Sequence, residues 1–177
     1  MNRSQGSHSI QRGFTLIELM ITIAVLSILL LIGSALTSAW VDRSQVNNSV
    51  SALKNAVFQA KSAALRNTND QPTTYPAVSV CFDRETNTIN VVRAAAYTPN
   101  ACIASIDNTP SQNYILQSYP IASGIALKTN AIDFECLAFN SSGVLILATG
   151  ITTTCLNDAN LKIDIEKNNE KANIQVN

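Results

Sequence analysis

The chain opens with an apolar run that carries a single charge. From residue 14 to residue 39 the only charged side chain is Glu18. About 20 consecutive apolar residues are enough to cross a bilayer as a helix, so the run predicts a transmembrane helix over residues 14–39. Two basic residues, Arg3 and Arg12, precede it, and by the positive-inside rule they place its N-terminus in the cytoplasm.

Beyond residue 40 the apolar positions fall on one side of a helix. They follow one another at alternating spacings of four and three residues: Val46, Val50, Leu53, Val57, Ala60 and Ala64. This period is typical of an amphipathic helix with one buried face. No proline lies between Phe14 and Asn67. One helix can therefore run from about residue 14 to residue 66, and its amphipathic half, residues 40–66, needs a folded domain to pack against.

After residue 67 the apolar period changes to two. Short alternating runs, separated by turn residues, predict strands over Val78–Phe82, Thr88–Arg93, Asn113–Tyr119, Ile125–Lys128, Ile132–Phe139, Val144–Leu147, Leu161–Ile165 and Ala172–Val176. Hairpin spacing indicates antiparallel pairing, and the helix is the only cover available to such sheets. The predicted fold class is α+β: a long N-terminal helix packed against a small antiparallel β-rich head, residues 67–177.

The head contains four cysteines, Cys81, Cys102, Cys136 and Cys155. Their spacings fit no zinc template, and the only histidine, His8, precedes the apolar run; neither a metal site nor a histidine-based triad is expected. An even cysteine count behind a membrane-targeting segment indicates disulfides in an oxidising compartment; buried thiols of a cytosolic protein are the alternative. Of the three possible pairings we favour Cys81–Cys102 and Cys136–Cys155, because each closes a local loop between neighbouring strands.

Charge and the remaining motifs argue against an enzyme and against a general DNA-binding surface. The chain has 12 basic and 12 acidic side chains, so it lacks the basic excess that binds nucleic acid. Asp133 and Glu135, two apart on one predicted strand, could form an acid pair or bind a cation, but we favour an ordinary solvated strand face. No phosphate loop, nucleophile elbow or cofactor motif occurs, and no cofactor is expected.

The stretch RGFTLIELM, Arg12–Met20, resembles the class III signal of type IV pilins and type II secretion pseudopilins. It combines a short basic leader ending in glycine, a phenylalanine, a glutamate five residues after the glycine and a long apolar helix. The resemblance implies that a prepilin peptidase cuts between Gly13 and Phe14 and N-methylates Phe14. It also implies that Glu18 pairs with the N-terminal amine of a neighbouring subunit, a partner that a carboxylate in hydrocarbon strongly favours.

The rest of the chain is similar to the FimT/FimU/GspH branch of minor pilins and pseudopilins, in its length, its helix-to-strand switch near Gln71–Cys81 and its turn at Phe139–Gly143. This similarity implies a pilin fold and a minor pilin, a structural subunit at or near the pilus tip that helps to prime assembly. The alternatives are a GspH-like pseudopilin of a type II secretion system and a FimT-like DNA-binding pilin. DNA-uptake members carry an arginine-rich motif near the C-terminus, whereas this chain has no arginine after Arg93, so DNA binding is not favoured.

The family resemblance also implies an organisation, partners and a location. Residues 1–13 are the leader, residues 14–39 the transmembrane and filament-core helix, residues 40–66 its amphipathic continuation and residues 67–177 the periplasmic head. Expected partners are other minor pilins, the major pilin or pseudopilins, the prepilin peptidase and the inner-membrane assembly platform. The subunit is expected in the inner membrane before assembly, and in a surface pilus or periplasmic pseudopilus afterwards.

Overall fold

The computed structural model describes residues 14–177 except residues 96, 103–112, 151–153, 159 and 177, and it describes the backbone but not the side chains of residues 32–36. The chain divides into two compact units, Met1–Trp40 and Val41–Asn177. Helix α1, Leu16–Arg66, contributes to both. The long helix predicted from the absence of proline is therefore confirmed, and the compact unit that holds the head begins within it.

Helix α1 ends where the backbone of Asn67 turns into the left-handed region, with φ of 39°. Asparagine tolerates this conformation better than most residues, because its short amide can bond locally. Here the Asn67 side chain accepts a hydrogen bond from the Gln71 N–H at 2.7 Å and donates one to the Gln71 carbonyl at 3.0 Å. The exit from the helix is thus fixed by a single side chain.

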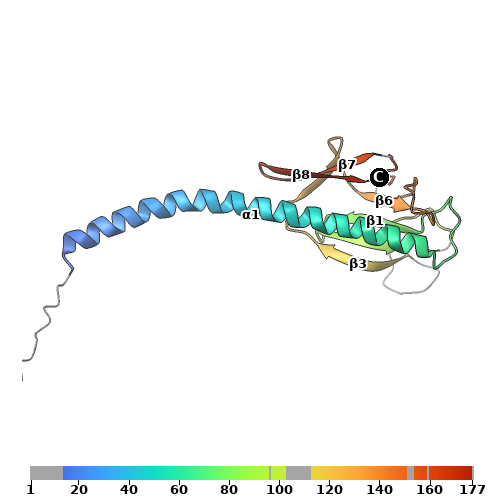
Figure 1. Ribbon diagram of the computed structural model, residues 1–177, viewed down its shortest axis with the longest axis horizontal. Helices are drawn as coiled ribbons and strands as arrows, with labels where there is room; N and C mark the ends of the chain where they lie inside the picture. The colour runs from blue at the N-terminus through green and yellow to red at the C-terminus, as the bar shows by residue number, and fades with distance from the viewer. Residues whose placement is uncertain (1–13, 96, 103–112, 151–153, 159, 177) are drawn as a thin grey trace, which may run out of the picture. The chain divides into compact units, whose positions relative to one another are not determined.

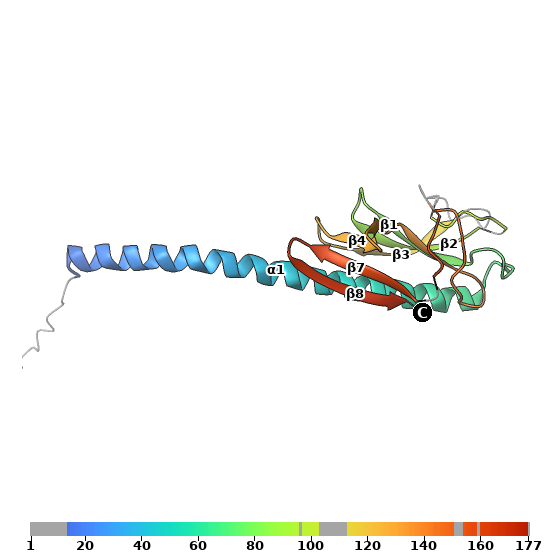
Figure 2. The same cartoon turned by 90° about the horizontal axis from the view of Figure 1, so that it is seen from above.

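The second unit contains two four-stranded sheets. The first has the order β3-β2-β1-β6, formed by Tyr114–Pro120, Thr88–Arg93, Val78–Asp83 and Cys136–Phe139. The second has the order β5-β4-β7-β8, formed by Ile132–Asp133, Ala126–Thr129, Leu161–Lys167 and Glu170–Val176. All neighbouring strands pair antiparallel, which confirms the α+β class. In Figures 1 and 2 the part of α1 within this unit lies along the strands.

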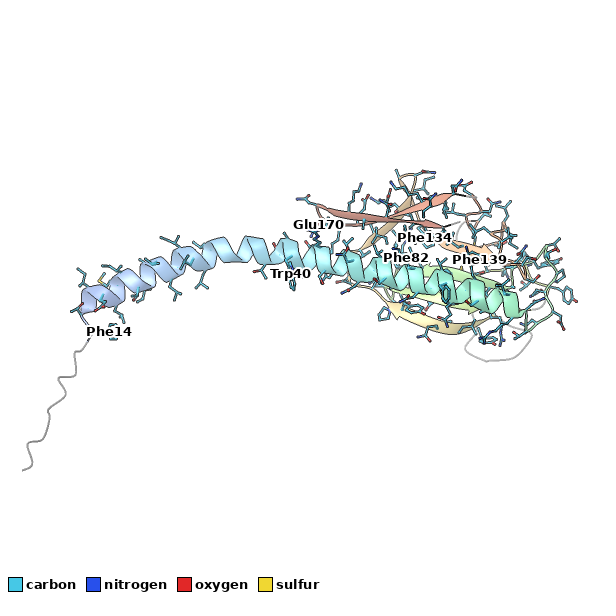
Figure 3. The ribbon with its side chains drawn as sticks, viewed as in Figure 1. Phe14, Trp40, Phe82, Phe134, Phe139 and Glu170 are labelled. Atoms are coloured by element: carbon cyan, nitrogen blue, oxygen red, sulfur yellow. A yellow bond between two sulfur atoms is a disulfide. The ribbon has the colours of Figure 1, made fainter. Side chains whose placement is uncertain are left out.

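The main core lies between this part of α1 and both sheets. Leu53, Ala60 and Ala64 are fully buried, and Val46 is 2% exposed, so the stripe predicted from the spacing is the packed face. The β-rich part contributes large side chains such as Phe139, in β6, and Phe134, which lies between β5 and β6; Figure 3 shows both beside the helix. The alanines of the helix, by leaving room, allow these large side chains to approach its backbone.

A second, smaller core covers the other face of the first sheet. Successive residues of a strand point to opposite faces, and in β1 Val80 joins the main core while Cys81 joins the second one. The other members are Val92, Ala101, Cys102, Cys136, Ala138, Ala148 and Cys155. Strand β1 is consequently buried on both faces, although it belongs to an antiparallel sheet.

The predicted strand Ile132–Phe139 is wrong as a single element. The structure divides it into β5, paired with β4 in the second sheet, and β6, paired with β1 in the first. The chain crosses between the sheets at Phe134 and Glu135. The Phe134 N–H donates to Leu127 O, in the second sheet, at 2.9 Å, and Glu135 O accepts from the Phe82 N–H, in the first sheet, at 2.8 Å. Periodicity alone gives no sign of such a change of partner.

The predicted strand Val144–Leu147 is also wrong. These residues form an isolated bridge, Phe139 with Leu145, and no continuous ladder. The Ile146 N–H donates to Ala138 O at 2.9 Å, so the segment follows the edge of β6 only in part. Val144 and Leu147 remain 57% and 63% exposed, and their apolar character therefore reflects neither strand pairing nor core packing.

Within the part of the chain that the structure describes, no helix is long and apolar enough to qualify as a membrane span. The prediction of a transmembrane helix over residues 14–39 is therefore not confirmed, although the helix itself is.

Candidate assembly segment at the N-terminus

The first turn of α1 is closed by a threonine that our reading of the sequence did not single out. Thr15 Oγ1 accepts a hydrogen bond from the Glu18 N–H at 3.3 Å, and Thr15 O accepts from the N–H groups of Glu18 and Leu19 at 3.1 and 3.2 Å. A threonine followed three residues later by glutamate is the capping-box pattern, a signal that was present in the sequence. The helix therefore starts at Leu16, and Phe14 precedes it, 83% exposed.

Glu18 lies in this first turn and is exposed. A carboxylate in the first turn is stabilised by the positive end of the helix dipole. Glu18 therefore also has a role in stabilising the helix, besides any role in docking. With the described residues its carboxylate forms no hydrogen bond or ion pair. Gly13, the other half of the predicted cleavage point, lies outside the described residues.

The helix that follows exposes apolar side chains on all sides. Large apolar residues that are at least half exposed are Leu16, Ile17, Leu19, Met20, Ile21, Ile23, Val25, Leu26, Ile28, Leu29, Leu30 and Leu31. Figure 3 shows side chains leaving this part of the helix, between Phe14 and Trp40, in different directions. A contiguous apolar surface of this size marks a protein or membrane interaction site. A helix that is apolar all round is one that a larger assembly buries.

Two hydroxyl groups in this segment, those of Thr22 and Ser27, are satisfied by the helix itself. Thr22 Oγ1 donates to Leu19 O and Ser27 Oγ to Ile23 O, both at 2.8 Å. Such internal bonds let a hydroxyl enter an apolar environment at little cost. Among the described side chains of residues 14–31, Glu18 is therefore the polar one that still needs a partner.

The head contains both disulfides that the sequence favoured. Cys81 is bonded to Cys102, with Cα atoms 5.6 Å apart, and Cys136 to Cys155, with Cα atoms 4.7 Å apart. They tie the irregular segments that carry Cys102 and Cys155 to strands β1 and β6. The loops are thereby attached to the first sheet.

Asp133 and Glu135, the candidate cation pair, lie on different elements of the fold. Asp133 lies in β5 and forms an ion pair with Arg84 at 2.7 Å, whereas Glu135 lies in the crossover between the sheets. Both line a hollow of about 340 Å³ together with Asp158. In the described part of the chain, no three carboxylates come within the distance at which they could share a metal ion.

The outer face of the second sheet carries lysines, and carboxylates neutralise them locally. Glu166 accepts from Lys171 at 2.5 Å and from Lys128 at 3.3 Å, while Lys162 lies 3.3 Å from Asp164. The hydrogen bond from Lys171 lowers the pKa of Glu166 below its ordinary value, and Lys128 adds to the effect. Paired in this way, the lysines offer little free positive charge to a polyanion.

Two further basic side chains of the head form contacts within the protein. Arg93 stacks on the Tyr114 ring at 3.8 Å and donates to Thr68 Oγ1 at 2.5 Å, and its partial burial lowers the pKa of the guanidinium. Lys167 reaches back to α1, where it bonds Gln45 and lies 3.7 Å from Asp42. These cations hold the head together.

The comparison with known families concerns the N-terminal segment alone. Residues 8–34 match the family model for the prokaryotic N-terminal methylation motif. The match covers the predicted cleavage point, Glu18 and most of the exposed apolar run. No curated protein and no solved structure gives a significant match to the chain. The motif, followed by an α+β head with two disulfides, indicates a type IV pilin-like or pseudopilin protein.

Proposed function

We propose that this chain is a minor type IV pilin, a structural subunit that sits at or near the pilus tip and helps to prime assembly. The observation that carries the proposal is the N-terminal segment. It combines a methylation motif over residues 8–34 with a helix whose apolar side chains are exposed on every side. Such a helix needs other helices or lipid around it.

Glu18 acts in this proposal as the docking charge. Moving an unpaired carboxylate into an apolar bundle is costly, and a cationic partner offsets much of that cost. The cationic partner is the N-methylated amine of Phe14 on a neighbouring subunit. The hydroxyls of Thr22 and Ser27 are already bonded. In this proposal the pairing of Glu18 therefore decides whether the helix enters the fibre, and in which register it packs against its neighbours.

The processing and location follow from the same segment. A prepilin peptidase removes residues 1–13 and methylates Phe14. The apolar helix holds the precursor in the inner membrane with its head in the periplasm, until the assembly platform transfers it into the fibre among other minor pilins and the major pilin. The two disulfides of the head suit an oxidising compartment. No catalytic function is proposed.

A minor pseudopilin of a type II secretion system is the second candidate, because every feature used above is shared by both classes. A DNA-binding pilin is less well supported. The lysines of the second sheet are paired with carboxylates, and Arg93 is stacked on Tyr114, so the described head lacks the free basic stripe that DNA binding requires.

The deciding experiment counts sheared surface pili in a strain that lacks this chain, beside the parent and a complemented strain. Loss of pili that complementation restores is the expected result. Normal piliation together with a defect in protein secretion would overturn the pilus assignment in favour of a pseudopilin. Normal piliation and normal secretion, with reduced DNA uptake, would favour the DNA-binding alternative.

A further inference from the structure

The two disulfides of the head are neighbours in space. The Sγ atoms of Cys102, Cys136 and Cys155 all lie within 4.8 Å of one another. Cys102 is bonded to Cys81, so one sulfur of this bridge lies within 4.8 Å of both sulfurs of the other bridge. Two disulfides that only attach separate loops to the sheet do not require their sulfur atoms to lie this close together.

The backbone brings the same four residues together. Cys81 in β1 and Cys136 in β6 are directly opposite each other in the sheet register. Cys102 and Cys155 lie outside the strands, on irregular segments held by a few backbone hydrogen bonds: the Ala101 N–H donates to Thr149 O, the Cys155 N–H to Ala148 O and the Leu156 N–H to Cys136 O. Two of the cysteines are thus fixed side by side in the sheet, and the other two are carried by segments outside the strands.

The side chains around the sulfurs are mostly small. Apart from the four cysteines, the second core consists of Val92 and three alanines, with Ile146 partly buried beside it. Cys102 is the most exposed of the four, at 8%, against 1% for both Cys136 and Cys155. Although all four are buried, Cys102 is thus the one that offers solvent the most surface.

We propose that the four cysteines form one thiol–disulfide exchange site, in which Cys102 transfers between Cys81 and the Cys136–Cys155 bridge. The inference is independent of the proposed function, since it uses only the head. Its partner is a dithiol of the oxidising compartment, such as the reduced form of a thiol oxidoreductase. By reducing the Cys81–Cys102 bond alone, that partner allows both disulfides to rearrange.

The chemistry balances without any further reagent. The dithiol reduces the Cys81–Cys102 bond, becomes a disulfide itself and leaves two thiols on the head. The Cys102 thiolate then attacks one sulfur of the second bridge: a bond from Cys102 to Cys136 or Cys155 forms, and the Cys136–Cys155 bond breaks. The electron pair leaves on the displaced sulfur, which takes up the proton that Cys102 released. The exchange itself changes no oxidation state.

The test is Cys81→Ser in the full-length chain, oxidised in the cell and purified in detergent. The sample is quenched in acid, because only the thiolate attacks, and its disulfide-linked peptides are identified by mass spectrometry. Bonds from Cys102 to Cys136 or Cys155, absent in the parent, are expected. With Cys81 removed, Cys102, Cys136 and Cys155 can form three different bonds, and two of these involve Cys102. Bonds to Cys102 should therefore occur in about two thirds of the molecules if the three bonds are equally stable. Cys136–Cys155 as the sole bond, with Cys102 free, would overturn the proposal.

Cys102→Ser is the matched control, because it frees Cys81, which does not belong to the group of three close sulfurs. Its Cys136–Cys155 bond should stay intact; as much rearrangement as in Cys81→Ser would overturn the role of Cys102. A second measurement avoids variants that fail to fold. The parent protein is reduced with less dithiol than it has disulfides and then quenched. New bonds from Cys102 to Cys136 or Cys155 are expected, and exclusively native bonds in the partly reduced molecules would contradict the proposal.

Discussion

The two halves of helix α1 differ both in their residues and in their surroundings: the first half is apolar all round, and the second has one apolar face. In the first half, described large apolar side chains from Phe14 to Leu31 are between 52% and 83% exposed. In the second half, Leu53, Ala60 and Ala64 are fully buried against the sheets. The same helical backbone therefore serves two purposes, and the difference lies in what covers each half.

The comparison separates stability from assembly. The second half is amphipathic, so its own unit buries its apolar stripe and gains folding free energy from it. The first half is apolar all round and finds no cover within its own unit, in the part that the structure describes. Its apolar area can contribute free energy only when another molecule or a lipid phase covers it. Substitutions in the two halves should therefore affect different measurements.

The largest effect is expected at the cleavage point before the first half. If the proposed prepilin peptidase cuts between Gly13 and Phe14, replacing Gly13 with a bulky residue, as in Gly13→Leu, should block removal of the leader, because the larger side chain would have to fit beside the cut. An immunoblot of cell membranes checks this by the size of the band. A mature-sized band from Gly13→Leu would refute the predicted cut between Gly13 and Phe14; Gly13→Ala, as the control, should be processed at least in part.

The next largest effect is expected for Glu18→Ala, which removes the docking charge of the first half. Cleavage should proceed, but incorporation into sheared fibres should be largely lost, since no carboxylate remains for the amine of the neighbouring subunit. Fibre fractions are compared with whole cells by immunoblot. Ser27→Ala is the matched control, because Ser27 bonds only its own helix. Normal incorporation of Glu18→Ala would show that the charge is dispensable.

One substitution made in both halves tests the comparison directly. Leu53→Ala should destabilise the head by about 2–5 kcal/mol, because it leaves a cavity in a fully packed core. Leu29→Ala, at a side chain 60% exposed, should change head stability by less than about 0.5 kcal/mol. Urea denaturation of the full-length chain in detergent, followed by circular dichroism, measures both. Equal losses in the two variants would contradict the division of roles.

The smallest effect concerns pH and is confined to the head. The folded-state pKa of Glu166 is below its ordinary value of 4.5 because of the hydrogen bond from Lys171. Its contribution to stability is therefore complete above about pH 4.5 and disappears as pH falls through the lowered pKa. Melting temperatures of the parent and of Glu166→Gln should converge in acid and differ slightly at neutral pH, since exposed ion pairs contribute little. A constant difference across the acid range would argue against this linkage.

The sequence predicted the local elements well and their long-range partners less well. The helix, its buried stripe and most strands follow from spacings within a few residues. The division of Ile132–Phe139 into two strands could not be predicted, because it depends on hydrogen bonds to Leu127 and Phe82. The capping role of Thr15 corresponds to a capping-box pattern that is visible in the sequence, with Glu18 three residues later.

The sequence by itself determined that an apolar helix precedes a cysteine-containing β-rich head, and it placed Gly13, Phe14 and Glu18 in a processing motif. These features depend on composition and on the spacing of residues that are close in the sequence, and both can be read from a single chain. Only the tertiary structure decided the order of the strands, the second core on the far face of β1 and the meeting of the sulfurs of Cys102, Cys136 and Cys155. Those depend on which distant segments bury the same surface, a choice that the free energy of the whole fold makes.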